Sequence, residues 1–293
     1  MVAIDRLRSA FASSGMLMKI IYINIGVFVA LRLCAIVCVF SGNAGYIDNI
    51  LAQIELPSDP ATFLTRPWTI LTYMFAQYDL LHIIFNMLWL YWFGTMFRMV
   101  ANDRQLLVLY IYGGIAGGVL FMAGYAALPL FHGGFGALIG SSASVIAIVT
   151  AVAILMPEFR MHLLFIGAVA VKWIAVITIL LVLIGVTGSN AGGEIAHIGG
   201  VLTGVLFALR YKKGVDITTP VGRLADRVSS LGRRKTRSSS HRSHTFVETP
   251  SGGLTPDERR ELDIILEKIK KSGYSALTPA ERDRLFNVSR RIR

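Results

Sequence analysis

Apolar runs of membrane-spanning length constrain this chain of 293 residues more than any other feature. Hydrophobic residues make up 54% of the sequence and charged residues only 16%, whereas about 25% of the residues in an average soluble domain are charged. A soluble core cannot hide several unbroken apolar runs of about 20 residues, which is the length that crosses a bilayer as a helix. The sequence therefore excludes a purely soluble protein and predicts an all-α polytopic membrane protein. The six predicted spans are residues 18–40, 80–100, 105–128, 141–156, 171–186 and 194–209.

Lysine and arginine alternate between the two sides of the predicted spans. They precede the first span, follow the second and the fourth, and continue after the sixth, whereas the opposite loops hold only Arg66. By the positive-inside rule, this pattern predicts that both termini are cytoplasmic. The N-terminus is polar and the first apolar run is long enough to be a true span, so we expect no cleavable signal peptide. The expected location is the bacterial inner (plasma) membrane, as an integral multi-pass protein.

The charge distribution divides the chain into four parts. Residues 212–293 hold 19 Lys and Arg against 10 Asp and Glu, and thus carry most of the net charge of +11. We expect a cytoplasmic N-terminus (1–17), a six-helix membrane core (18–211), a basic disordered linker (212–253) and a small cytoplasmic helical hairpin (254–293). The basic residues of the linker are expected to hold anionic lipid headgroups, and no nucleic-acid partner is expected.

Two copies of one capping pattern predict the helices of the tail. Thr255-Pro256-Asp257-Glu258 and Thr278-Pro279-Ala280-Glu281 each combine a threonine cap, a proline at the first helical position and a glutamate at the third. A hairpin of about 40 residues is marginal alone, which points to docking on a partner or on another copy.

A few polar side chains interrupt the predicted spans at one depth. His82, Asn86, Ser142 and His197 come from three different spans, and each costs a few kcal/mol to insert. With a rise of about 1.5 Å per residue, they stand roughly 18 to 24 Å above the cytoplasmic ends of their helices. Because the hydrocarbon layer is about 30 Å thick, all four would lie recessed below the outer surface. The sequence therefore predicts a wet pocket.

Glycines indicate how the helices around this pocket pack. Gly200 and Gly204 share the helix face of His197, and small residues four apart let two helix backbones come close. We expect this face to pack against the span that begins with Ser142. That span follows a glycine-rich loop, and irregular backbone at such depth is tolerable only where it lines a protein cavity or water.

The four polar residues have the chemistry of a hydrolase site. A serine hydroxyl becomes a strong nucleophile when a neighbouring base takes its proton, and an imidazole suits that task. Ser142 and His197 fill these roles. His82, the Asn86 amide and the backbone N–H of Ser142 are candidate donors to the oxyanion, and the dipole of the helix that begins at Ser142 adds to them.

Three stretches in this order resemble the motifs of the rhomboid family of intramembrane serine proteases: His82-Ile83-Ile84-Phe85-Asn86, Gly140-Ser141-Ser142-Ala143 and Ala196-His197-Ile198-Gly199-Gly200. The resemblance covers about residues 60–210. It implies a six-helix bundle that cleaves transmembrane segments of other proteins near the outer face with a serine–histidine dyad. Carried over by position, it implies Ser142 as nucleophile, His197 as base, and His82 and Asn86 as oxyanion donors. No cofactor and no metal is expected, because the chain has no His-Glu-x-x-His motif.

The chain departs from the family pattern at three points. Ala143 follows the serine where the family usually has glycine, and Ile146 stands where it often has an aromatic residue. The Trp-Arg pair common in the first loop of the family reads Trp68-Thr69 here.

The sequence leaves two interpretations open for the role of each of three polar residues. Ser141 is a weaker candidate for the nucleophile than Ser142. Glu194 lies one turn before His197 and could orient it, but an interfacial carboxylate is the favoured reading. Arg32, in the outer half of the first span, either pairs within the bundle or snorkels to the headgroups, and snorkelling is favoured.

Two other functions compete with proteolysis. A catalytically silent rhomboid-like protein would bind membrane helices without cutting them. A small-solute transporter fits six spans, but its polar residues would gather at the midplane of the bilayer and not near one face.

Overall fold

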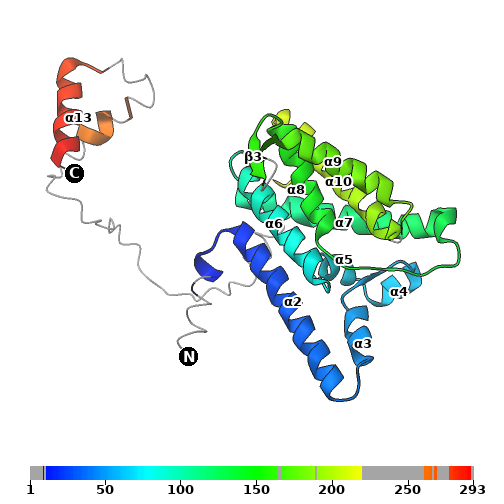
Figure 1. Cartoon of the computed structure of the whole chain (residues 1–293). Coiled ribbons are helices and arrows are strands. Elements are labelled where there is room, and N and C mark those ends of the chain that lie inside the picture. The colour runs from blue at the N-terminus through cyan, green and yellow to red at the C-terminus, as the bar shows by residue number, and fades with distance from the viewer. Residues whose placement is uncertain are drawn as a thin grey trace. The chain divides into compact units, whose positions relative to one another are not determined.

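The computed structural model of this chain describes residues 9, 11–163, 167–188, 190–219, 261–265, 267–268 and 277–291 (Figure 1). The chain forms two compact units, Met1–Arg234 and Lys235–Arg293.

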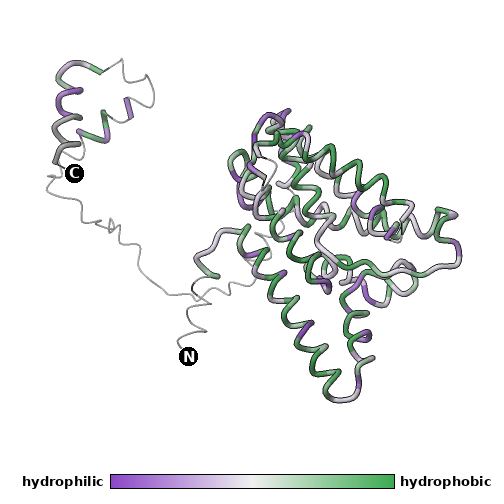
Figure 2. The backbone as a smooth tube through the Cα atoms, viewed as in Figure 1, coloured by the Kyte–Doolittle hydropathy of each residue, from purple (hydrophilic) through white to green (hydrophobic). Residues whose placement is uncertain are grey.

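Six apolar helices build the first unit, and their ends lie within three residues of the predicted spans. Figure 2 shows them as predominantly hydrophobic, with scattered hydrophilic positions. They are α2 (Met16–Phe40), α6 (Leu80–Phe97), α7 (Asp103–Ala127), α8 (Ser142–Leu155), α9 (Val171–Gly185) and α10 (Ala191–Lys212).

Four of these helices have the length and composition of membrane spans. Among the described residues these are α2, α6, α7 and α10, whereas α8 and α9 are shorter, with 14 and 15 residues. A helix of that length extends about 21 Å, less than the roughly 30 Å of the hydrocarbon layer. The structure supports an integral multi-pass membrane protein, and the number of six spans stays a prediction.

Side-chain caps fix where the helices begin. The Asp79 carboxylate accepts the backbone N–H of His82 at 2.7 Å and starts α6. Asn102 and Gln105 form a reciprocal capping box at the start of α7. Arg98 and Asp103 pair at 2.6 Å across the turn that joins α6 to α7.

Helix α8 lies at the centre of the bundle, where it packs against α6, α7, α9 and α10. Every residue from 143 to 153 is buried. The approach of α10 is especially close, because a Cβ atom added to Gly200 would lie 2.2 Å from the carbonyl oxygen of Ala143. A Cβ on Gly204 would lie 2.4 Å from the carbonyl oxygen of Ala147. Both glycines thus lie in the contact between α10 and α8.

The loop between α2 and α6 is built from short elements tied to the segment that precedes α8. Strand β1 (Leu56–Pro57) pairs antiparallel with β2 (Ala137–Leu138), with Leu56 opposite Leu138. A second antiparallel pair, β3 (Arg160–Leu163) and β4 (Gly167–Ala170), lies between α8 and α9 in the chain. The short elements are α3 (Tyr46–Ala52), β1 (Leu56–Pro57), α4 (Pro60–Thr65), α5 (Thr69–Thr72), η1 (Tyr73–Phe75), η2 (Pro129–Phe131), β2 (Ala137–Leu138), β3 (Arg160–Leu163) and β4 (Gly167–Ala170).

Arg32 contacts two aromatic rings of the protein, and the favoured prediction that it snorkels to the headgroups stays a prediction. Its guanidinium carbon lies 4.3 Å from the ring centroid of Tyr78 and 5.7 Å from that of Phe28. The face of an aromatic ring attracts a cation, which offers this half-buried arginine a partner inside the bundle.

The start of the predicted disordered linker is ordered. After α10 the chain turns, Ile217 packs against the core of the bundle, and Thr218 is buried with its hydroxyl on Asp216. The remainder of the predicted linker, from residue 220, lies outside the described residues.

The second unit contains α13 (Pro279–Arg291) and helical residues at 261–265 and 267–268. The capping box predicted at the start of α13 is confirmed: the Thr278 N–H donates to Glu281 at 2.7 Å, and the Glu281 N–H donates back to the Thr278 hydroxyl at 3.4 Å. The box predicted at residues 255–258 lies outside the described residues.

Two ion pairs join the helical segments of this unit. Lys268 contacts Glu281 at 2.8 Å, and Arg284 contacts Glu261 at 2.9 Å. The hydrogen bond from Lys268, followed by those from Thr278, lowers the pKa of Glu281 to about 2. The Glu281 carboxylate is therefore ionised at neutral pH, as its ion pair with Lys268 requires.

Candidate active site

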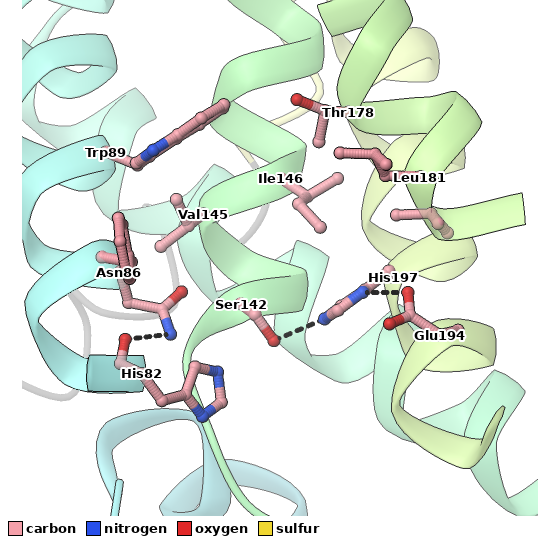
Figure 3. A pocket seen from close by; sticks show the side chains of 12 residues that line it. His82, Asn86, Trp89, Ser142, Val145, Ile146, Thr178, Leu181, Glu194 and His197 are labelled. Atoms are coloured by element: carbon pink, nitrogen blue, oxygen red, sulfur yellow. Dashed lines mark hydrogen bonds and ion pairs between the residues drawn. The ribbon is translucent and has the colours of Figure 1, made fainter. Parts of the chain in front are cut away.

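Ser142 and His197 meet between α8 and α10 (Figure 3). The Ser142 hydroxyl oxygen lies 2.7 Å from Nε2 of His197, although 55 residues separate them in the chain. This is hydrogen-bond distance, the arrangement in which an imidazole can take the proton of a serine hydroxyl.

A glycine turn carries Ser142 to this position. Gly140 has a φ of +133°, a conformation that favours glycine, and a Cβ there would lie 2.8 Å from the ring of His82. The Gly140 N–H donates to the Tyr73 carbonyl at 3.0 Å, which fixes the turn against η1. Ser142 is then the first residue of α8, so its backbone N–H belongs to the donors that no intrahelical carbonyl satisfies.

Glu194 contacts His197, so the favoured prediction of an interfacial carboxylate is wrong. An oxygen of Glu194 lies 2.8 Å from Nδ1 of His197, and the two side chains are 19% and 15% exposed. The residues lie three apart in α10, a spacing that brings two side chains to one helix face. Glu194 lies in the first turn of α10, where the helix dipole favours a negative charge.

His82 and Asn86 lie one turn apart on α6, across the cavity from His197 (Figure 3). The Asn86 amide nitrogen donates to the backbone carbonyl of His82 and to Oε1 of Gln77, both at 3.0 Å. Both amide hydrogens of Asn86 therefore have an acceptor inside the protein.

These side chains line a single cavity of about 320 Å³. Most of its wall is aromatic or aliphatic, so the polar groups form a small patch in an apolar recess. The lining residues are His82, Phe85, Asn86 and Trp89 of α6, Ser142, Val145 and Ile146 of α8, Thr178, Leu181 and Val182 of α9, and Glu194 and His197 of α10. Within the described part of the chain, no group of three or more His, Cys, Asp or Glu side chains is arranged to hold a metal ion.

The two residues around Ser142 that depart from the family pattern occupy different places. Ala143 is buried where three helices meet, against Gly200 of α10 and Gly117 of α7. Ile146 lines the cavity one turn beyond Ser142 and gives the recess an aliphatic wall there.

Ser141, the weaker candidate for the nucleophile, is fully buried outside the cavity lining. Its hydroxyl accepts a hydrogen bond from Gln77 at 3.2 Å. This contact makes Ser141 part of a buried polar network behind the cavity.

The sequence analysis missed two members of that network, Gln77 and Asn24, which are both fully buried. Asn24 is a polar residue inside the first predicted span, which is the signal that would have identified it. Gln77 lies just outside a predicted span, where a polar residue carries no such signal.

Comparison with known proteins bears on the family of this chain. The family model described as "Rhomboid domain" matches residues 64–213, which is half of the chain and includes every residue of the cavity. The chain belongs to the rhomboid family. The resemblance of its three motifs is thus confirmed. A family of unknown function, DUF6576, matches residues 256–291 of this rhomboid.

A curated relative of this rhomboid is RHOMBOID-like protein 12, mitochondrial, from Arabidopsis thaliana. The two are 29% identical over 161 residues, which cover 51% of this chain and 48% of the relative. The alignment therefore spans about half the length of that protein.

Proposed function

We propose that this rhomboid is an intramembrane serine endopeptidase that cleaves transmembrane segments of other membrane proteins near the outer face. The observation that carries the proposal is the 2.7 Å contact between the Ser142 hydroxyl and Nε2 of His197. The apolar recess around this contact supports a substrate that itself comes from the bilayer.

In the proposed reaction, Ser142 Oγ attacks the scissile carbonyl carbon and its proton passes to Nε2 of His197. The tetrahedral intermediate collapses when His197 returns that proton to the leaving amine nitrogen, which breaks the peptide bond. Water, deprotonated by the same imidazole, then attacks the acyl-enzyme ester, and the proton returns to Ser142 as the ester bond breaks.

Glu194 would act on the histidine and not on the substrate. Its carboxylate accepts the Nδ1–H of His197, which leaves the Nε2 lone pair facing Ser142. The same negative charge would stabilise the imidazolium that forms when the serine proton is transferred. The proposed dyad is thus extended to three residues.

The oxyanion would be bound by His82, by Asn86 and by the backbone N–H of Ser142. Asn86 must release one of its two present acceptors to do so. An anionic oxygen accepts a hydrogen bond about twice as strong as a neutral carbonyl does. We therefore expect the Asn86 N–H that now donates to the His82 carbonyl to change its acceptor and donate to the oxyanion as it forms.

The substrate should be a segment that is extended or easily unwound at the cleavage site. A scissile carbonyl inside a helix is hydrogen-bonded and shielded, so residues of low helix propensity near the cut should favour cleavage. The aromatic and aliphatic cavity wall fits apolar neighbours of the scissile bond.

The proposed setting is the bacterial inner membrane, with six spans and both termini in the cytoplasm. The alternation of Lys and Arg along the chain supports this orientation, with α8 and α9 as short spans. The basic residues of 212–253 would then face the cytoplasmic leaflet and hold anionic headgroups.

Alanine substitution of either reactive residue tests the proposal. Ser142→Ala and His197→Ala should each abolish cleavage of a reporter transmembrane segment by the purified protein in liposomes, because nucleophile and base act as one unit. Ser144→Ala serves as the control for a serine substitution on the same helix and should retain cleavage, because the Ser144 hydroxyl has no hydrogen-bond partner among the described residues. Unchanged cleavage with either Ser142→Ala or His197→Ala would refute the proposal.

A catalytically silent rhomboid that binds membrane helices is the second candidate, since the resting Asn86 amide already has acceptors for both hydrogens. Fluorophosphonate labelling distinguishes the two functions. An active enzyme is modified at Ser142, whereas a silent protein leaves that hydroxyl unlabelled.

A further inference from the structure

Gln77 lies in the loop between η1 and α6, outside the cavity lining, and is fully buried. Its side-chain nitrogen donates to Asn24 at 3.1 Å and to Ser141 at 3.2 Å. Its side-chain oxygen accepts from Asn86 at 3.0 Å. A buried amide is costly without partners, and this one has partners on three different parts of the bundle.

The direction of these hydrogen bonds follows from Asn24, which lies at the end of the network away from Asn86. A backbone carbonyl can only accept, so the carbonyl of Ile20 requires the NH₂ group of Asn24, at 2.9 Å. The oxygen of Asn24 then faces Gln77 and requires the NH₂ group of Gln77. The oxygen of Gln77 is consequently left to face Asn86, which must present its own NH₂ group.

The far end of the network is also anchored. The phenol of Tyr110 on α7 donates to the backbone carbonyl of Met74 at 2.6 Å and accepts from Asn24 at 3.2 Å. Asn24 and Tyr110 are both fully buried. Helices α2 and α7 therefore hold the network in place, and Gln77 connects it to α6.

This arrangement affects the oxyanion site directly. One amide hydrogen of Asn86 is held by Gln77, and the other by the His82 carbonyl one turn earlier in the same helix. Gln77 also holds Ser141, the residue that precedes the proposed nucleophile. One side chain therefore connects the amide that would bind the oxyanion to the turn that carries Ser142.

We propose that Gln77 is a positioning residue of the active site: it fixes the orientation of the Asn86 amide, so that the NH₂ group and not the amide oxygen can turn to the oxyanion. This inference rests on the proposed proteolytic function. Gln77 lies behind the cavity wall and acts through Asn86. It keeps one amide hydrogen of Asn86 hydrogen-bonded, so that the other, now donated to the His82 carbonyl, is the one that turns to the oxyanion.

Gln77→Met tests the inference, because methionine has a similar length and no hydrogen-bonding amide. The expected result is a kcat for reporter cleavage that is lower by roughly tenfold to a hundredfold, the effect of a small misplacement of a catalytic group. KM should stay within about twofold, because the apolar cavity wall that binds the substrate is unchanged. The rate of fluorophosphonate labelling at Ser142 should fall in parallel, since the phosphonate oxygen occupies the oxyanion position.

Ser144→Ala is the matched control. Ser144 is fully buried on α8, and its hydroxyl has no hydrogen-bond partner among the described residues. Loss of this buried hydroxyl should leave kcat unchanged. If Ser144→Ala lowered kcat as much as Gln77→Met does, the general loss of a buried polar group would explain both effects, and the inference would be overturned.

A double-mutant cycle with Asn86→Ala separates positioning from a merely structural role. If Gln77 acts through Asn86, Gln77→Met should lower kcat no further in the Asn86→Ala background. Additive losses would overturn the inference, as would a wild-type kcat in Gln77→Met. Absence of both cleavage and labelling in the wild-type protein would instead refute the proposed function, and the inference with it.

Gln77→Glu provides a second variant in case Gln77→Met does not fold, which thermal unfolding would reveal. The carboxyl group keeps an acceptor toward Asn86 and loses donors toward Asn24 and Ser141. Its kcat should therefore lie between those of the wild type and Asn86→Ala. A kcat at or below that of Asn86→Ala would overturn the inference, because the retained acceptor would then have no effect.

Discussion

Both ring nitrogens of His197 have a partner, and the two partners differ in kind. Nδ1 faces the carboxylate of Glu194, which can only accept, whereas Nε2 faces the hydroxyl of Ser142. A neutral imidazole carries one proton, so the carboxylate determines which nitrogen bears it. At the scale of single residues, this pairing would leave Nε2 of His197 free to accept the Ser142 proton in the proposed reaction.

Glu194→Gln should lower kcat for reporter cleavage by roughly tenfold to a thousandfold with little change in KM. The amide has no charge to stabilise the imidazolium, and it can present its NH₂ group to Nδ1 and favour the wrong tautomer. Steady-state kinetics on the reporter segment measures both constants.

Glu158→Gln is the control for the loss of a carboxylate in the same assay. Glu158 is exposed and pairs with Lys172 away from the cavity lining. Equal kinetics for the wild type and Glu194→Gln would show that the contact with His197 has no catalytic effect.

At the scale of the helices, glycines decide how far His197 is from Ser142. Gly200 lies one turn after His197, and its missing side chain lets α10 rest on the backbone of α8 at Ala143. Ala143 follows Ser142 directly. The contact between the two backbones therefore sets the distance across which the serine proton would pass.

Gly200→Ala should destabilise the protein by about 1–3 kcal/mol, because its Cβ would overlap a backbone carbonyl that cannot rotate away. The added methyl group should also separate the helices and slow fluorophosphonate labelling of Ser142. Thermal unfolding in detergent and the labelling rate measure the two effects.

Gly26→Ala on α2 is the matched control, because a Cβ at this helical glycine meets nothing within 4 Å. It should leave labelling unchanged and preserve or raise stability, since alanine is the better helix former by about 1 kcal/mol. The packing argument fails if both alanine variants behave alike.

At the scale of the whole molecule, the site belongs to one unit. All cavity-lining residues lie between His82 and His197, within the unit Met1–Arg234. The described residues of the unit Lys235–Arg293 contribute none of them.

A chain that ends at Arg234 should therefore keep the wild-type rate of fluorophosphonate labelling and of reporter cleavage. Labelling of the full-length and truncated proteins in the same liposomes is the measurement. A labelling rate reduced more than about threefold by truncation would show that the C-terminal unit takes part in forming the site.

The amino-acid sequence by itself determined the helices of the bundle and the two residues of the proposed reactive pair. In a bilayer the backbone must satisfy its own hydrogen bonds, so each long apolar run has little choice but a helix, and helix ends follow from local caps. The predicted depth of Ser142 and His197 in the membrane follows from the constant rise of a helix, and the placing of Gly200 on the face of His197 follows from the helical period. The family motifs lie on the same residues.

Only the tertiary structure decided the partners of Glu194, Arg32 and Gln77. Glu194 lies in the first turn of α10 and Arg32 in the second half of α2. A long charged side chain at such positions can reach either the interface or the bundle, and the sequence does not specify its rotamer. Two of the three partners of Gln77 lie 53 and 64 positions away in the chain. Such contacts depend on which helices lie side by side, and that depends on packing of the whole bundle, which no local pattern encodes.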